Sequence, residues 1–202
     1  MNPIFFVIIV AVWAYVLYVL KKAKIKAWGF FWGSLGLFII LMVFVQPYVT
    51  TPLARCVTAL AALIGKATGA FLAYFKYSII FITPKVGDSM TLMVDMECSG
   101  VIEIMAFLCL LAFYEVYSLA ERAIMGIIGF CYIMLCNALR IVIICMSVYF
   151  WGTSAYYVVH TFVGRIIFYI LSVILYFYVF TKPQIASMKV GNFSYGNAKN
   201  NS

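Results

Sequence analysis

Charge is scarce in this chain of 202 residues, because only 10% of its residues are charged, with 14 Lys and Arg against 6 Asp and Glu. Soluble domains carry about 25% charged and about 45–50% apolar residues, whereas this chain is 67% hydrophobic with a mean hydropathy of +1.10. So few charges cannot cover the water-facing surface of a soluble globule, and so much apolar surface excludes a disordered chain. The sequence therefore predicts an all-α polytopic membrane protein.

Other patterns are missing as well. The apolar runs are long and continuous rather than alternating, which excludes a porin-like barrel. The six cysteines lack the CxxC or Cys–His spacings of zinc sites, so we expect no metal and no other cofactor. The net charge of +8 could indicate nucleic acid, but basic segments in membrane proteins more often mark cytoplasmic loops, so we expect no nucleic-acid partner. No basic segment precedes the first apolar run, so a cleavable signal peptide is not expected.

Five apolar runs are long enough to cross a hydrocarbon core about 30 Å thick. They cover residues 4–20, 27–46, 98–117, 123–150 and 161–180. A weaker run at residues 53–75 contains Lys66 and two glycines. We expect an amphipathic helix there, at the membrane interface or under a cap, and a sixth span is the alternative. The expected organisation is one integral membrane domain at residues 1–182 and a polar cytoplasmic tail at 183–202.

Basic residues predict the orientation, because lysine-rich loops favour the cytoplasm. Four lysines at residues 21–26 would lie inside, and five spans then also place Arg122 and the lysines of the tail inside. Residues 47–97 become an extracytoplasmic cap of a protein of the cell membrane. Within this cap, β-rich segments at 77–83 and 90–96 flank a turn cluster at 84–89, which predicts a β-hairpin that leads directly to Cys98.

Three reactive or charged side chains from different runs share the outer boundary of the membrane in this topology. Cys98 begins the fourth run, and His160, the only histidine, precedes the last one. Arg140 lies 17 residues beyond Ala123, which corresponds to about 26 Å along a helix. A thiolate is a nucleophile favoured by nearby cations and by a helix N-terminus, a histidine can protonate a leaving amine, and an arginine can bind an oxyanion. This set is suited to acyl transfer.

Each of these residues also has a structural explanation. Cys98 could be a packing residue, His160 an interfacial anchor, and Arg140 a side chain that extends to the lipid headgroups. A shared depth says nothing about lateral approach. A disulfide between Cys98 and Cys56 would block the thiol. Ser99 could also be considered as a rhomboid-like nucleophile, but the residues around it form no GxSx motif.

Three motifs occur in a fixed order after the expected hairpin: Glu-Cys-Ser-Gly-Val at 97–101, Asn-Ala-Leu-Arg-Ile at 137–141, and His160 followed by Gly164. They resemble the signature blocks of the exosortase/archaeosortase family over about residues 45–180. The short chain and the glutamate before the cysteine are similar to the exosortase G branch.

The resemblance implies a membrane cysteine transpeptidase or protease. Such an enzyme cuts the C-terminal sorting signal (a short motif, a transmembrane helix and a basic tail) from exported proteins. Cys98 would form a thioacyl intermediate, His160 would act as acid and then base, and Arg140 would stabilise the oxyanion or orient the substrate. A cell-surface acceptor would resolve the intermediate, so the expected partners are exported substrates and the lipid bilayer.

Two further residues are candidates for support of this site. Asn137 shares the helical face of Arg140 and could hold it, donate to the oxyanion or bond to another helix. Arg165 could neutralise Glu103 in a structural ion pair within the membrane.

Two other classes of function remain as alternatives. One is a small transporter or channel component whose polar path is lined by Arg140, Arg165, Glu103 and Glu115. The other is a non-enzymatic assembly factor for a surface polysaccharide or a secretion system.

Overall fold

The protein is mostly helical, with one small sheet. The computed structural model describes residues 3–85 and 87–185. The α-helices are α1 (Pro3–Lys22), α2 (Lys26–Phe44), α3 (Gln46–Thr68), α4 (Met96–Ser99), α5 (Val101–Phe113), α6 (Leu119–Trp151), α7 (Ala155–Val158) and α8 (Gly164–Tyr176). The strands are β1 (Phe71–Tyr74), β2 (Ile79–Ile82) and β3 (Met90–Met93), and a 3₁₀ turn, η1 (Phe75–Tyr77), separates β1 from β2.

The last helical stretch contains two π-helical turns, η2 (Val159–Val163) and η3 (Phe177–Thr181), on either side of α8. The helix continues through them, from Ala155 to Ile185. The helix thus includes residues 183–185, the first three of the expected tail, and residues 186–202 lie outside the described part of the chain.

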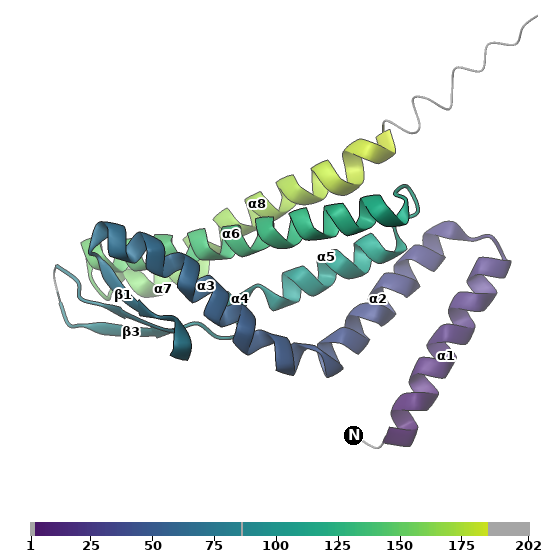
Figure 1. Cartoon of the computed structure of the whole chain (residues 1–202), viewed down its shortest axis with the longest axis horizontal. Coiled ribbons are helices and arrows are strands. Elements are labelled where there is room, and N and C mark those ends of the chain that lie inside the picture. Colours follow the sequence, from purple (N-terminus) through teal and green to yellow (C-terminus); the bar gives the residue numbers. More distant parts are fainter. Residues whose placement is uncertain (1–2, 86, 186–202) are drawn as a thin grey trace, which may run out of the picture.

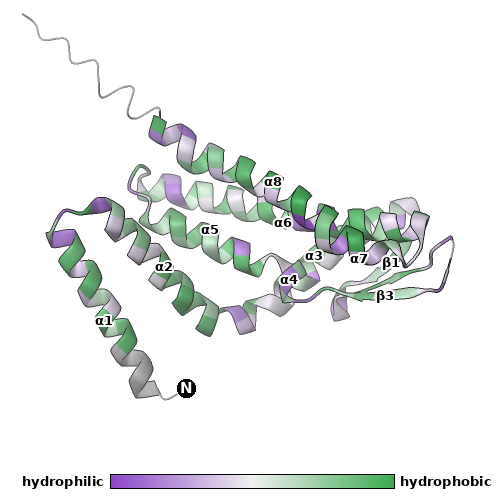
Figure 2. Ribbon diagram, turned by 180° about the vertical axis from the view of Figure 1, so that it is seen from behind, coloured by the Kyte–Doolittle hydropathy of each residue, from purple (hydrophilic) through white to green (hydrophobic). Residues whose placement is uncertain are grey.

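Several helices have the length and apolar composition of membrane spans. Within the described residues these are Lys26–Phe44, Gln46–Thr68, Leu119–Trp151 and Ala155–Ile185, and α5 is a shorter apolar helix. Figure 2 shows hydrophobic residues along α2, α5, α6 and α8, with hydrophilic residues gathered at the turns and around α4. These features confirm the all-α polytopic membrane class; the count of five spans stays a prediction.

The long helices form a row in which each packs on the next. α1 packs on α2, α2 on α5, α5 on α6, and α6 on α8 (Figure 1). Within this row α6 is the longest helix, and its 33 residues extend about 50 Å, well beyond a hydrocarbon core of about 30 Å. The end of α6 therefore projects past the bundle, where α3, α7 and the sheet surround it.

The weaker apolar run forms α3, but its last part was predicted wrongly. The helix ends at Thr68, where Gly69 adopts a left-handed conformation, and residues 71–74 form β1 instead of a final helical turn. The buried side of α3 includes Leu53, Val57 and Ala61 at four-residue intervals, as in an amphipathic helix. Figure 1 shows α3 leaving α2 and extending beyond the start of α5 towards the sheet, although its length and composition also suit a span.

The predicted hairpin is confirmed as β2 and β3, which pair antiparallel with Ile79 opposite Met93. β1 adds a third strand that the sequence analysis missed, so the sheet order is β1-β2-β3. One face of the sheet is buried through Phe71, Ile80 and Leu92, which alternate with exposed residues as in a half-buried sheet. This face packs against α3 and the projecting end of α6, and it anchors the chain that enters α4.

Candidate active site

Cys98 lies on α4, a single turn between the sheet and α5. Asp95 caps this turn, since its Oδ1 accepts a hydrogen bond from the backbone N–H of Glu97 at 3.1 Å. Gly100 then takes a left-handed backbone with φ of +74° and separates α4 from α5. The prediction of one continuous helix over residues 98–117 is therefore wrong, because the chain bends at Gly100 and α5 ends at Phe113.

Gly100 also allows the bend to press against α6. A β-carbon at this position would overlap the amide nitrogen of Asn137, so no side chain fits there. Asn137 is fully buried and donates through Nδ2 to the carbonyl of Ile133 on its own helix, at 3.1 Å. This bond differs from the expected contact with Arg140 or with another helix. In the structure Asn137 packs against the turn that follows Cys98.

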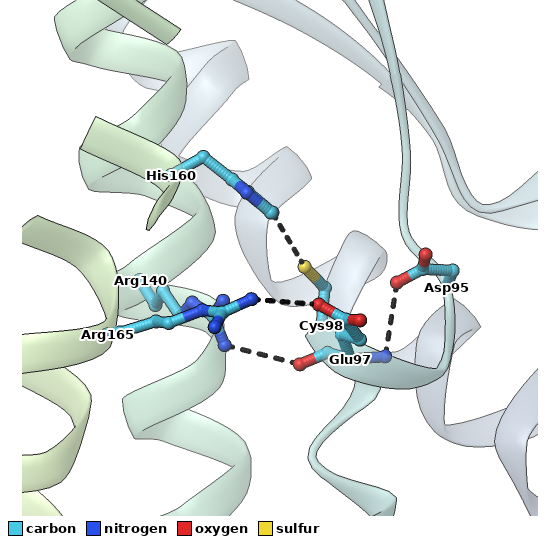
Figure 3. Close-up of polar contacts among 6 residues, drawn as sticks. All are labelled: Asp95, Glu97, Cys98, Arg140, His160 and Arg165. Atoms are coloured by element: carbon cyan, nitrogen blue, oxygen red, sulfur yellow. Dashed lines mark hydrogen bonds and ion pairs between the residues drawn. The ribbon is translucent and has the colours of Figure 1, made fainter. Parts of the chain in front are cut away.

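His160 faces Cys98 from the opposite side of the site. Its Nε2 lies 3.5 Å from the Cys98 Sγ, as Figure 3 shows, and only 3% of Cys98 is exposed. His160 belongs to the π turn η2, and its ring stacks on that of Tyr156 with 5.1 Å between centroids and 23° between planes. π turns are frequent at functional sites, where the extra residue re-aims a side chain. Here the thiol and the imidazole are within reach of proton transfer.

Arg140 enters the same site from α6. It is 4% exposed, and its Nη1 donates to the carbonyl oxygen of Glu97 at 3.2 Å. Its side chain passes close to Gly164, where a β-carbon would lie 3.3 Å from the Arg140 Cγ. The Nε of Arg140 is buried without a hydrogen-bond partner in the described part of the chain. A buried guanidinium nitrogen is a strong donor, and the hydrogen-bonding capacity of this one is unused in this state.

Arg165 pairs with Glu97 and not with Glu103. Its Nη2 lies 3.1 Å from the Glu97 Oε2, and both side chains are about half exposed. The expected pair of Arg165 with Glu103 is therefore wrong. Glu97 lies on α4, before the bend at Gly100, and its side chain points to Arg165 of α8 (Figure 3). Glu103 lies on α5, after the bend.

Two competing explanations for Cys98 and its neighbour are also resolved by geometry. Cys56 and Cys98 are both free thiols, exposed and buried respectively, so the disulfide considered from the sequence is not formed. The Ser99 hydroxyl donates to the Met96 carbonyl at 3.0 Å and accepts from the Val101 N–H at 3.4 Å, within its own turn. Ser99 stabilises the bend and does not face His160.

Burial dominates the electrostatics of Cys98. It raises the pKa of the thiol to about 11, outweighing the Arg140 charge, which lowers it, while Asp95 and Glu97 raise it further. The expectation that neighbouring cations favour a resting thiolate is therefore wrong for this state. The thiol keeps its proton near neutral pH, so any attack by sulfur requires an acceptor for that proton, and His160 is the adjacent base.

Two contributors to this arrangement, Tyr156 and Asp95, were not expected from the sequence. Tyr156 lies four residues before His160, so the helical period could have indicated their shared face. Asp95 is an N-cap residue type directly before a helical turn. The roles of Gly100 and Gly164 depend on contacts with α6, which no local pattern reveals. No three His, Cys, Asp or Glu side chains in the described residues form a group that could hold a metal ion.

The fold and site define a multi-pass membrane protein with a buried thiol–imidazole pair beside an arginine. The family model described as Transmembrane exosortase (Exosortase_EpsH) matches residues 3–177. The chain therefore belongs to the transmembrane exosortase family, as its motifs predicted. Members of this family are generally cysteine-type enzymes that process exported proteins carrying sorting signals. Comparison with curated proteins and with solved structures gives no match.

Proposed function

We propose that this protein is a membrane-embedded cysteine transpeptidase that cleaves the C-terminal sorting signal of exported proteins and transfers them to a cell-surface acceptor. The observation that carries the proposal is the 3.5 Å contact between the Cys98 Sγ and the His160 Nε2, with the buried Arg140 beside them. In this proposal Cys98, Arg140 and His160 are the catalytic residues. Asn137 supports the turn that follows Cys98, and Arg165 supports the residue before it.

The first half-reaction forms a thioester. The Cys98 sulfur attacks the scissile carbonyl carbon while its proton passes to His160, so a C–S bond forms and the carbonyl oxygen becomes an oxyanion. Collapse of this tetrahedral intermediate breaks the C–N bond. The imidazolium of His160 gives its proton to the departing amine, which leaves on the transmembrane part of the signal.

The second half-reaction releases the product. An acceptor amine or hydroxyl attacks the thioester carbonyl, and His160, now neutral, takes its proton. Collapse breaks the C–S bond, and the proton on His160 returns to the leaving thiolate, which restores the resting Cys98 thiol. The raised pKa of Cys98 agrees with such a cycle, because the sulfur is activated only when a proton acceptor is in place.

Arg140 is assigned to charge and not to proton transfer, because a guanidinium stays protonated in proteins. Its Nε is a buried donor without a partner in the described residues, while its Nη1 is occupied by the Glu97 carbonyl. We assign the guanidinium charge to stabilisation of the developing oxyanion, where a single preorganised donor contributes about 10²–10³ in rate.

We also propose an orientation of the protein in the membrane and a branch of the family. We place the site at the extracytoplasmic face of the plasma membrane, with residues 47–97 as the cap and the lysines at 21–26 inside, because this arrangement puts every short basic cluster in the cytoplasm. The glutamate directly before Cys98, Glu97, supports membership of the exosortase G-like branch.

The channel alternative gains no support from the placement of its charges. Glu115 lies in the turn after α5 and pairs with Lys26 of α2 at 3.1 Å, both side chains being largely exposed. Arg165 pairs with Glu97 near the opposite end of α5. Three of the four charges of that polar path, Arg140, Arg165 and Glu115, are thus engaged at two separate ends of the bundle.

The test uses an exported protein encoded beside this chain that ends in a short motif, a hydrophobic helix and basic residues. It carries one tag before the signal and one at its C-terminus. Co-expression with the wild-type chain should separate the tags, and Cys98→Ala, Arg140→Ala and His160→Ala should each leave them joined. Glu115→Gln, which breaks a remote ion pair, is the matched control. Normal separation of the tags with Cys98→Ala would refute the proposal.

A further inference from the structure

Glu97, the residue before Cys98, is held at every one of its polar groups. Its backbone N–H donates to the Asp95 Oδ1 at 3.1 Å, and its carbonyl accepts from the Arg140 Nη1 at 3.2 Å. Its carboxylate accepts from the Arg165 Nη2 at 3.1 Å (Figure 3). The main chain immediately before the thiol is therefore fixed from three directions.

The ion pair of Glu97 and Arg165 joins the same two parts of the chain as the contact of Cys98 with His160. Glu97 and Cys98 are adjacent on α4, while His160 and Arg165 lie five residues apart on the continuous helix of η2 and α8. α4 has only four residues and is separated from α5 by the left-handed Gly100, so its orientation depends on contacts with other elements. A contact at 3.5 Å between sulfur and nitrogen is lost with a small displacement of either part.

We propose that Glu97 and Arg165 are positioning residues whose ion pair ties α4 to α8 and thereby keeps the Cys98 thiol within hydrogen-bonding distance of His160. The use of Cys98 and His160 in catalysis rests on the proposed function. Neither residue needs to touch the substrate.

A purely electrostatic role for Glu97 predicts the opposite effect. The Glu97 charge raises the pKa of Cys98, as does that of Asp95, while Arg140 and Arg165 lower it. Removal of the Glu97 charge alone would therefore make the thiol more reactive. Loss of positioning makes it less reactive, because the thiol then lacks the base that accepts its proton.

The experiment measures thiol reactivity, which needs no substrate. The full-length protein in lipid nanodiscs reacts with iodoacetamide at pH 7.5, and mass spectrometry follows the peptide that contains Cys98. Glu97→Gln and Arg165→Gln should each slow alkylation by about two- to fivefold, the size expected for a half-exposed ion pair. The exchanged pair, Glu97→Arg with Arg165→Glu, should restore the rate to within about twofold of wild type.

The matched control is Glu115→Gln. It breaks the ion pair with Lys26, which has the same 3.1 Å separation but lies at the other end of α5. This variant should alkylate at the wild-type rate. A comparable slowing by Glu115→Gln would show a general loss of structure and overturn the proposal.

The decisive measurement repeats the substitution without the histidine. His160→Ala should slow alkylation, and Glu97→Gln should add no further slowing to it, because positioning acts only through His160. Three results would each overturn the proposal. The first is that wild type and His160→Ala alkylate at equal rates. The others are that Glu97→Gln slows alkylation equally with and without His160, or that Glu97→Gln alkylates faster than wild type. If this coupling is found while Cys98→Ala still processes the tagged substrate, the proposed function fails and the positioning role stands.

Discussion

The central residue of the site is a cysteine that depends on its neighbours for reactivity. Burial holds the pKa of Cys98 at about 11 despite the nearby Arg140. Many cysteine enzymes instead lower the thiol pKa with a cation or a helix N-terminus. In the proposed mechanism the thiol and the base, 3.5 Å apart, operate as a unit, in the manner of a nucleophile activated by an adjacent base.

The raised pKa makes a prediction about pH. The thiolate is the reactive form, and a folded-state pKa above the ordinary value leaves little of it below pH 9. The alkylation rate of Cys98 should therefore keep rising up to about pH 10, whereas an ordinary thiol of pKa about 8.5 levels off by then. Peptide-resolved alkylation between pH 7 and pH 10 checks this. A plateau below pH 9 would contradict the role assigned to burial.

Gly100 supports a second prediction at this scale. Gly100→Ala should abolish processing of the tagged substrate, because the new methyl group overlaps the Asn137 amide and displaces the turn that carries Cys98. Gly69→Ala is the control, since Gly69 has a similar φ of +67° but no atom within 4 Å of the added β-carbon. Both variants bear backbone strain of about 1 kcal/mol, so only Gly100→Ala should lose processing. Equal losses would assign the effect to strain alone.

The last helix contains a π turn, η3, that has an identifiable cause. Pro183 follows η3 and lies four residues after Val179, so the α-helical hydrogen bond to the Val179 carbonyl has no N–H donor. The hydroxyl of Tyr117 donates to that carbonyl instead, at 2.8 Å. The turn between α5 and α6 thereby holds the end of the last helix.

We expect Tyr117→Phe to destabilise the protein by about 1–3 kcal/mol, because the Val179 carbonyl then lacks this donor. Adding Pro183→Ala should recover part of the loss, since alanine supplies a backbone N–H. Tyr132→Phe is the comparison, because the Tyr132 hydroxyl donates to Leu171 within the regular α8, at 3.1 Å. Thermal unfolding in detergent measures all three. A loss for Tyr132→Phe equal to that for Tyr117→Phe would contradict this explanation.

Element boundaries could be predicted from the sequence only for helices formed by a long, uninterrupted apolar run. The run at 123–150 lies within α6, and the run at 161–180 lies within the last helical stretch. The predictions failed at two glycines, Gly69 and Gly100, where a left-handed residue ends a helix inside an apolar run. Glycine is compatible with both a continued helix and its end, and tertiary contacts decide between them.

For the whole molecule, the row of helices places the site at one end of the bundle and the ion pair of Lys26 with Glu115 at the other. The projecting part of α6, together with α3 and the sheet, surrounds the site end (Figure 1). A substrate anchored by its own transmembrane helix would meet the thiol where that helix leaves the membrane.

This arrangement predicts labelling from outside the cell. In a chain with Cys56 and Cys131 replaced by serine, a cysteine at Asp88 should react with a membrane-impermeant maleimide in intact cells. A cysteine at Lys24 should react only after permeabilisation. The basic residues at 21–26 and the five-span topology both require this result. Labelling of Lys24→Cys in intact cells would reverse the orientation.

The sequence by itself determined the membrane class and the family, and it predicted the residues of the candidate site. Apolar run lengths, the scarcity of charge and three ordered motifs are local properties that need no coordinates. The tertiary structure decided which charges pair, since Arg165 meets Glu97 and not Glu103. It also decided that Cys98 rests as a thiol, because its burial on α4, which packs against α3, α5 and α6, outweighs the charge of Arg140. Both outcomes depend on the lateral packing of helices distant in the chain, which hydropathy and spacing do not encode.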